Sequence, residues 1–250
     1  MDESNDELYK RVGKLQGWDF SNVKYEKYYQ GDYKYFDEIN RYLTPTSLVL
    51  DIGTGGGENL LKKMKDAGYI FGIDNCKEMI DKANENLKKY PGKRVKFLKM
   101  DGNNILFPKG IFDIICSRHC WDNPSSAYKL LNDRGRYFSE DIENDDCMEL
   151  KNIFGRGQCF NEKTKLQDKI VPLLLKSGFK KENVIIYQIS IKEYYKTKND
   201  LIYLLLNTPI IPDFFKIDGD ENKFNEYANK YKTNKGILLN RKLFGIIAKK

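Results

Sequence analysis

The sequence predicts an α/β fold in which a mostly parallel sheet carries helices on both faces. Short apolar runs such as Leu48 to Ile52 alternate with helical stretches such as Lys77 to Lys89, and this alternation is typical of βαβ units. The first apolar run passes through a glycine cluster into a helical pattern, which is the strand, turn and helix of a nucleotide-binding unit. With 250 residues, 40% of them hydrophobic, the chain can bury one substantial core, so we expect a single domain over residues 1–250.

Composition excludes several classes of protein. No apolar run approaches the roughly 18 residues of a membrane span, and residues 1–6 are acidic and polar, so we expect a soluble, cytoplasmic protein without a membrane partner. The five cysteines lack C-x-x-C spacing, which favours thiols over a disulfide framework and predicts no metal site. The net charge is +7, and residues 222–250 hold eight Lys or Arg against the single Glu226. Such a segment can attract nucleic acid, an anionic small molecule or a membrane surface, but few arginines and no nucleic-acid-binding module favour an ordinary solvated face.

A glycine-rich turn follows the first apolar run. Gly53, Gly55 and Gly57 let the backbone turn without Cβ clashes, so a ligand can approach main-chain N–H groups at the start of the next helix. A second strand, Tyr69 to Ile73, follows that helix. The stretch therefore predicts a cofactor site at the carboxyl edge of the sheet.

Two acidic residues frame this turn. Asp51 lies two residues before Gly53, and Asp74 ends the second strand, where an acidic side chain can accept both hydroxyls of a ribose. A dinucleotide site requires a small residue at the last position of G-x-G-x-x-G, which is Glu58 here. The spacing D-x-G-x-G-x-G instead resembles motif I of the class I S-adenosylmethionine-dependent methyltransferases.

This resemblance implies a Rossmann-like fold with a seven-stranded, mostly parallel sheet, and S-adenosylmethionine as the cofactor. In that family an acid or amide after the third strand hydrogen-bonds the adenine amine. Asp101, which follows the strand Val95 to Met100, matches that position, although an aspartate in an Asp-Gly turn is also an ordinary loop residue. The expected cofactor-binding residues are Asp51, Gly53, Thr54, Gly55, Gly57, Asp74, Asn75, Asp101, Gly102 and Ser117.

The fourth strand, Phe112 to Ser117, resembles motif IV of the family and delivers Arg118, His119, Cys120 and Trp121 at the edge where open parallel sheets bind ligands. His119 is the only histidine, and an imidazole titrates near neutrality, so we predict it to be a catalytic base. Arg118 is predicted to pair with an acidic group of the acceptor. In the alternative interpretation, His119 hydrogen-bonds a neighbouring loop and Arg118 is solvated.

The segments outside the cofactor unit follow the same patterns. The predicted later elements are a helix near Ser126 to Asn132, a fifth strand from Arg136 to Ser139, a helix from Glu162 to Lys176, a sixth strand from Val184 to Ile191, and a closing strand within 236–250, centred on Phe244 to Ala248. We expect residues 1–47 to form an N-terminal helical and aromatic segment, 48–191 the cofactor-binding core, and 192–235 a helical cap inserted over the substrate site.

The N-terminal segment is rich in aromatic residues. Tyr35, Phe36, Ile39 and Tyr42 have the spacing of the apolar stripe of a helix. The tyrosines of residues 25–29 continue no clean stripe. The resemblance implies that they wall the acceptor pocket or face the sulfonium, and a purely structural role stays equally open.

The sequence therefore predicts an enzyme that transfers a methyl group from S-adenosylmethionine to a small-molecule acceptor. The D/N/S-P-P-Y/F motif of nucleic-acid amino-methyltransferases does not occur after the fourth strand, which reads Ser117 to Cys120 as SRHC. Methylation of RNA is the second hypothesis. A non-catalytic protein that binds S-adenosylmethionine is the third, because the family has no universal catalytic residue.

Overall fold

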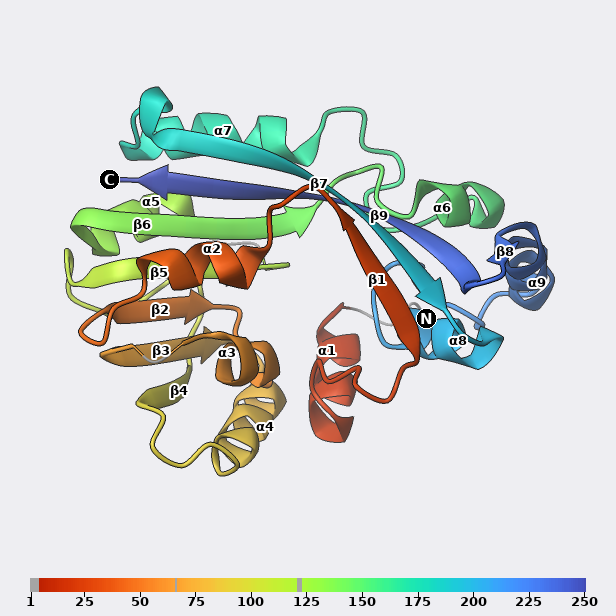
Figure 1. Ribbon diagram of the computed structural model, residues 1–250, viewed down its shortest axis with the longest axis horizontal. Coiled ribbons are helices and arrows are strands. Elements are labelled where there is room, and N and C mark those ends of the chain that lie inside the picture. Colours follow the sequence, from red (N-terminus) through yellow and green to blue (C-terminus); the bar gives the residue numbers. More distant parts are fainter. Residues whose placement is uncertain (1–4, 66, 121–122) are drawn as a thin grey trace.

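The computed structural model describes residues 5–65, 67–120 and 123–250, and its strands form one sheet (Figure 1). The strand order is β1-β7-β9-β6-β5-β2-β3-β4, and β8 pairs with β9 off this path. The strands are β1 (Tyr25–Gln30), β2 (Leu48–Ile52), β3 (Tyr69–Asp74), β4 (Val95–Lys99), β5 (Phe112–Arg118), β6 (Leu131–Ile142), β7 (Val184–Tyr195), β8 (Lys232–Thr233) and β9 (Gly236–Lys249). The helices are α1 (Asn5–Leu15), α2 (Tyr35–Tyr42), α3 (Glu58–Lys63), α4 (Lys77–Leu87), α5 (Pro124–Leu130), α6 (Met148–Phe154), α7 (Leu166–Ser177), α8 (Lys198–Leu206) and α9 (Asp220–Lys230).

The predicted mostly parallel core is confirmed. Neighbouring strands from β4 through β3, β2 and β5 to β6 pair in parallel, whereas β9 is antiparallel to both β6 and β7. Consequently β7 runs in the same direction as β6, and β9 is the reversed strand of a seven-stranded core. The described chain adds two strands to this core, because β1 pairs with β7 and β8 with β9, both in antiparallel fashion.

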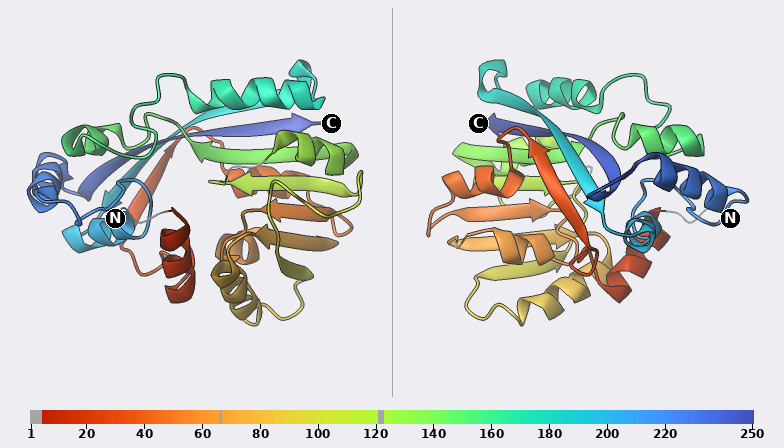
Figure 2. Two further views of the ribbon diagram at one scale, coloured as in Figure 1. Left: turned by 180° about the vertical axis from the view of Figure 1, so that it is seen from behind. Right: turned by 45° about the vertical axis from the view of Figure 1, so that its right-hand side comes forward.

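Helices cover both faces of the sheet, and the alternation of side chains along β2 shows why. Val49 packs in a buried cluster with residues of α2, α3 and α4, whereas Leu50 packs in a second cluster with residues of α5 and α7. Successive side chains of a strand point to opposite faces, so a continuous apolar run needs a helical layer on each side. Figures 1 and 2 show the two layers from the front and from behind.

Two strands extend beyond their predicted ends. β6 begins at Leu131 because Leu131 already pairs with Phe112, before an irregularity in the register of β5. β7 continues to Tyr195, past the predicted end at Ile191, because its last residues pair with β1 on one side and with the start of β9 on the other. Both neighbours come from sequence positions far from β7, so the local pattern of β7 contains no sign of them.

The predicted cap region, residues 192–235, contains the end of β7, both α8 and α9, and β8. Its helices pack with α6 around a cluster that includes Tyr195, Leu201, Phe224 and Leu239, at the end of β9 opposite to the C-terminus (Figure 1). A position over the acceptor remains a prediction. Among the described residues, no helix combines the length and apolar character that crossing a bilayer requires.

The N-terminal segment is less helical than predicted. Tyr35 and Ile39 are buried on α2, as the predicted stripe requires, but the tyrosines of residues 25–29 belong to strand β1. Every second side chain of that strand shares one face, which is why these tyrosines fit no helical stripe. Tyr25 stacks on Tyr195 of β7, with ring centroids 5.3 Å apart.

Candidate active site

The glycine-rich turn connects β2 to α3 at the carboxyl edge of the sheet. Gly53, Gly55 and Gly57 have φ values of 71°, 56° and 71°, in the left-handed region that favours glycine. A Cβ at Gly57 would lie 2.6 Å from Cζ of Phe97, so this position also needs a residue without a side chain. The backbone N–H groups of Gly53 and Thr54 both donate to the carbonyl of Ile73, at 2.9 Å, and join the turn to β3.

Asp74 lies directly beside this turn, as the ribose assignment requires. Its Oδ2 accepts from the backbone N–H of Gly55 and its Oδ1 from that of Cys76, both at 2.9 Å. Burial raises the pKa of this carboxyl, and the backbone amides around it oppose that shift. A carboxylate offers about four acceptor positions, so these amides do not exhaust it and ribose hydroxyls can still bind. The residues of the turn therefore fit a nucleoside cofactor.

Asp51, at the end of β2, is a half-buried carboxyl. Burial raises its pKa to about 6, although the charge of Arg118 opposes the shift. The thiol of Cys116 donates to its Oδ1 at 3.4 Å. Thr54 follows, with its hydroxyl facing Gly72 of β3. Asp51 thus lies between the cofactor turn and the charged end of β5.

The remaining predicted cofactor residues lie along the same edge with different local roles. Asn75 is exposed next to Asp74. Asp101 is exposed and accepts from the backbone N–H of Asn103 at 2.8 Å, which is the ordinary Asx turn of the alternative interpretation. Gly102 lies over β2, where a Cβ would be 3.0 Å from Cγ2 of Ile52. Buried Ser117 donates its hydroxyl to the carbonyl of Cys120 at 3.1 Å, so this hydroxyl holds the loop after β5.

His119 occupies a constrained position immediately after β5. Its φ is 53°, which is unusual for a residue with a side chain, and its backbone N–H donates to the carbonyl of Glu140 at 2.8 Å. The imidazole Nδ1 lies 3.7 Å from Oδ1 of Asp141, and Nη1 of Arg118 lies 3.8 Å from Oε1 of Glu140. Trp121, predicted at the same edge, lies outside the described residues.

The sequence-based prediction missed Glu140 and Asp141. It ended the fifth strand at Ser139, whereas β6 continues to Ile142 beside β5. The parallel register places Glu140 opposite Arg118. Glu140 and Asp141 therefore lie next to His119, the predicted base. Two consecutive acids at the carboxyl end of a core strand were the available signal.

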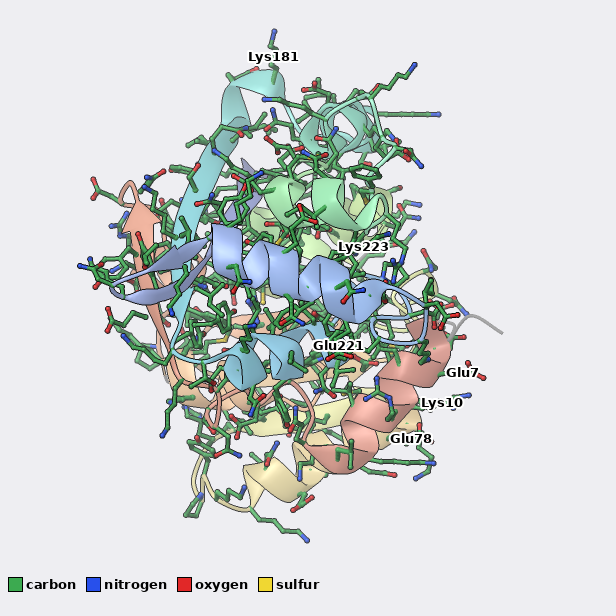
Figure 3. The ribbon with its side chains drawn as sticks, turned by 90° about the vertical axis from the view of Figure 1, so that its right-hand side faces the viewer. Glu7, Lys10, Glu78, Lys181, Glu221 and Lys223 are labelled. Atoms are coloured by element: carbon green, nitrogen blue, oxygen red, sulfur yellow. The ribbon has the colours of Figure 1, made fainter. Side chains whose placement is uncertain are left out.

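The N-terminal helix packs on α4, next to the glycine-rich turn. Leu8 and Val12 of α1 pack on Met79 of α4, and Gly13 permits this approach because a Cβ there would lie 3.1 Å from the backbone of Glu78. Figure 3 shows α1 beside α4, with Lys10 and Glu78 labelled where the two helices meet. The N-terminal segment is thereby held against the start of α4, next to the cofactor turn.

Two aromatic side chains of this segment reach the site. Cδ1 of Trp18 lies 2.5 Å from the position that a Cβ of Gly55 would take, and the rings of Tyr9 and Trp18 meet edge to face with centroids 5.7 Å apart. Burial raises the pKa of Tyr9, and the neighbouring Cys120, Asp141 and Asp74 raise it further. Tyr9 was not a predicted site residue, although it lies near both the ribose acid and the partner of His119.

Glu58 occupies the position where a dinucleotide-binding motif requires a small residue. Its carboxyl forms hydrogen bonds that connect the N-terminal segment to the glycine-rich turn. Its Oε1 accepts from Nδ2 of Asn86 at 3.2 Å, and Asn86 also donates to the carbonyl of Gly56 at 2.9 Å. Burial raises the pKa of Glu58 to about 7, against hydrogen bonds from its own backbone and from that of Trp18. The carboxyl therefore links α3, α4 and the segment that carries Trp18.

Comparison with known proteins agrees with this geometry. Residues 49–135 match a family model described as a methyltransferase domain. An uncharacterised methyltransferase, YcgJ of Bacillus subtilis, is 29% identical over 93 residues, and that alignment spans 37% of this chain and only 37% of the relative. The matched region begins in β2 and ends in β6, so it contains the glycine-rich turn, Asp74 and His119.

Solved structures extend the likeness in fold to most of the chain. The crystal structure of YcgJ has a TM-score of 0.57 at 17% identity and covers 86% of this chain and 97% of its own. A methyltransferase structure from Bacillus halodurans has a TM-score of 0.56 at 15% identity, with coverage of 86% and 96%. A Haemonchus contortus phosphoethanolamine N-methyltransferase in complex with S-adenosyl-L-methionine has a TM-score of 0.51 at 18% identity, with coverage of 85% and 51%. Residues 49–135 are therefore similar to a methyltransferase domain, and most of the chain has the fold of solved methyltransferases, in agreement with the D-x-G-x-G-x-G turn.

Proposed function

We propose that this chain transfers the methyl group of S-adenosylmethionine to a small-molecule acceptor, with His119 as the base. The observation that supports the proposal is the proximity of two sets of groups at one sheet edge. Asp74 and the glycine-rich turn bind the nucleoside, and the His119–Asp141 pair follows the adjacent end of β5. In open α/β sheets this edge is where ligands bind.

In this proposal, separate side chains bind the cofactor and accept the proton of the acceptor. The cofactor supplies, when bound, a methyl group on a positively charged sulfur. Asp74 accepts the ribose hydroxyls, and Asp51 places a carboxyl between the turn and Arg118. The carboxylate of Asp141 faces Nδ1 of His119, which favours a proton on that nitrogen and leaves Nε2 to accept a proton from the acceptor. Such a base typically contributes 10²- to 10⁴-fold, and alignment of the reactants contributes most of the remainder.

The N-terminal helix has a role in this proposal as the cover of the site. Trp18, which follows α1, lies on Gly55, and Tyr9 of α1 lies near Asp74, so the N-terminal segment would limit the access of water to a cofactor bound at the turn. Exclusion of water strengthens the electrostatic interactions among the buried carboxyls. The same cover limits the size of the acceptor, which supports a small molecule.

The basic segment at residues 222–250 also supports a small-molecule acceptor over RNA. Arg241 donates to Asp146 through Nε at 2.9 Å and Nη2 at 3.0 Å. The ammonium groups of Lys235 and Lys242 lie over the ring of Tyr28 and against Ser190, respectively. Arg241 is thus paired with an acid, and the exposed lysines that remain can supply only the generic, salt-dependent attraction that any basic surface has for RNA.

The experiment is methyl transfer from radiolabelled S-adenosylmethionine to separated pools of metabolites and RNA from cell extract. We expect label in the metabolite pool, and we expect the His119→Ala variant to keep its affinity for S-adenosylhomocysteine while its turnover falls at least about tenfold. Label in RNA alone would replace the proposal with its alternative. Cofactor binding without transfer to either pool would favour a non-catalytic binding protein.

A further inference from the structure

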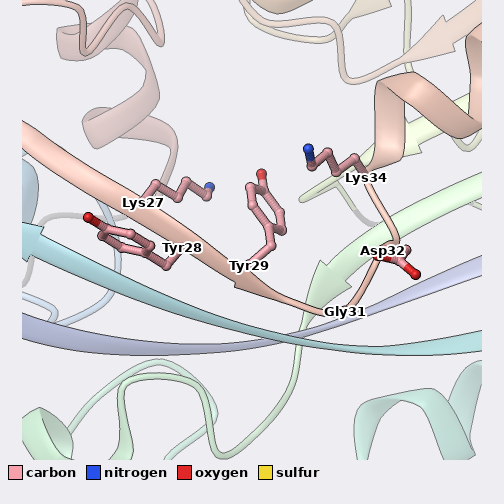
Figure 4. A pocket seen from close by; sticks show the side chains of 6 residues that line it. All are labelled: Lys27, Tyr28, Tyr29, Gly31, Asp32 and Lys34. Atoms are coloured by element: carbon pink, nitrogen blue, oxygen red, sulfur yellow. The ribbon is translucent and has the colours of Figure 1, made fainter.

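A cavity of about 340 Å³ lies on β1 and the loop that leads from β1 to α2. Figure 4 shows that the ammonium groups of Lys27 and Lys34 flank Tyr29, whose hydroxyl points to the same side, whereas the carboxylate of Asp32 points away. The two Nζ atoms lie 5.1 Å and 5.8 Å from the centroid of the Tyr29 ring. The cavity is therefore lined by two cations and a phenol, and its volume suits a small molecule.

The strand register places Lys27 and Tyr29 on the same face of β1. Lys27 lies opposite Glu193 and Tyr29 lies opposite Ile191 in the β1–β7 pairing, and both β7 residues are buried. Directly opposed residues of paired strands share a face, so Lys27 and Tyr29 lie on the face of β1 that continues the buried face of β7, although both stay open to solvent. Tyr28, on the alternate face, packs against Tyr194 with centroids 5.7 Å apart.

A second pair of cations adjoins the first pair at the end of β5. Nζ of Lys63 lies 5.4 Å, and Cζ of Arg118 lies 5.9 Å, from the ring centroid of Phe36. Phe36 lies in the first turn of α2, which begins directly after Lys34, so this pair adjoins the cavity. Desolvation, together with the charges of Arg118 and Lys27, lowers the pKa of Lys63 to about 8. Arg118 also lies close to the cofactor turn, because its charge opposes the rise that burial causes in the pKa of Asp51 there.

Two of the four cations in this cluster have an acidic partner within ion-pairing distance. Glu193 lies 3.4 Å from Lys27 and Glu140 lies 3.8 Å from Arg118. In the part of the chain that the structure describes, Lys34 and Lys63 have no acidic side chain within ion-pairing distance. Glu193 is moreover shared with Arg241, whose Nη1 lies 3.7 Å from it, so the cluster keeps an excess of positive charge that favours an anion such as phosphate.

We propose that Lys27, Lys34, Lys63 and Arg118 hold the phosphate of a water-soluble phosphate monoester that is the methyl acceptor. This proposal rests on the proposed function and narrows its substrate class. Lysine ammonium groups bind phosphate as point charges, and the Tyr29 hydroxyl adds a hydrogen-bond donor. Because Arg118 precedes His119 in the chain, a phosphate held here leaves the other end of a small acceptor to reach the base and the cofactor.

The first experiment measures binding of inorganic phosphate to the full chain saturated with S-adenosylhomocysteine, by calorimetry. In the Lys34→Gln/Lys63→Gln variant we expect phosphate affinity to fall at least about tenfold, since each lost ammonium removes a charge-assisted contact. The matched control is Lys88→Gln, which removes an exposed charge just after α4, outside the cluster, and should bind phosphate as the wild type does. Equal phosphate affinity in the double variant, or equal binding of acetate and phosphate by the wild type, would overturn the proposal.

The second experiment identifies the acceptor class by transfer of label to water-soluble metabolites, with and without prior treatment of the extract with alkaline phosphatase. We expect phosphatase treatment to abolish the labelled product, and we expect the untreated product to bind an anion-exchange resin. Undiminished label after treatment, or label confined to an organic phase of lipids, would refute the phosphate site. Binding of S-adenosylhomocysteine, measured in the same calorimeter, tests the proposed function separately, because a chain that binds the cofactor but not phosphate loses only this inference.

Discussion

Replacement of Glu58 by Gln should make the protein more stable at high pH, although it removes a buried carboxyl. The carboxyl has an ordinary pKa of 4.5, and burial raises it to about 7 in the folded chain. Because the folded-state pKa is the higher one, the stability that the protonated carboxyl contributes is fully present below about pH 4.5. That contribution is lost as the pH rises through about 7.

The size of the effect follows from the shift. Each unit of pKa difference corresponds to about 1.4 kcal/mol, so ionisation of Glu58 costs the folded state about 3 kcal/mol when it is complete. Most of this cost falls between pH 5 and pH 8, and partial solvent access reduces it to about 2 kcal/mol. Gln keeps an acceptor for Asn86 but does not ionise.

Urea unfolding at several pH values between 5 and 8 measures this difference. The free energies of unfolding of the wild type and Glu58→Gln should agree near pH 5 and diverge by about 2 kcal/mol at pH 8, with the variant more stable. Glu85→Gln, which changes an exposed carboxylate of α4, is the matched control and should show no such gain. A difference between wild type and Glu58→Gln that stays constant across this range would refute the reasoning, because it would mean that Glu58 ionises without cost.

Three further predictions concern ligands and catalysis. Asp74→Ala should weaken binding of S-adenosylhomocysteine by about 1.5 to 3 kcal/mol in calorimetry, because hydrogen bonds to a charged group are lost, while NAD should not compete for the site. Asp141→Asn should lower turnover and shift its pH profile without changing cofactor affinity, whereas an unchanged profile would limit Asp141 to a structural role. Any RNA binding should be weak and should disappear as salt is raised to physiological concentration, in filter-binding assays; a sequence-selective complex that persists there would contradict the small-molecule assignment.

The cofactor half of the site could be predicted because its signals are local. The glycine turn requires left-handed φ values within five residues, and Asp74 follows the next strand, so one short stretch of sequence specifies both. Alternating apolar runs likewise predicted β2, β3, β4 and β5 close to their observed bounds. In each case the interaction that fixes the structure joins residues close in sequence.

The acceptor half could not be predicted in the same way, because distant segments build it. Lys27 reaches the site through a strand pairing with β7, more than 160 residues away, and Asp141 through the parallel register of β5 and β6. The chain passes from β2 outward to β3 and β4 and then returns to β5 on the other side of β2, so the turn after β2 lies where the strand order reverses. A crevice at that point is open on one side, and only elements from elsewhere can close it. Here α1 packs on α4 beside that turn and β1 brings Lys27 to the same edge from a distant part of the chain, so the acceptor residues that we propose come from separate segments that no local pattern joins.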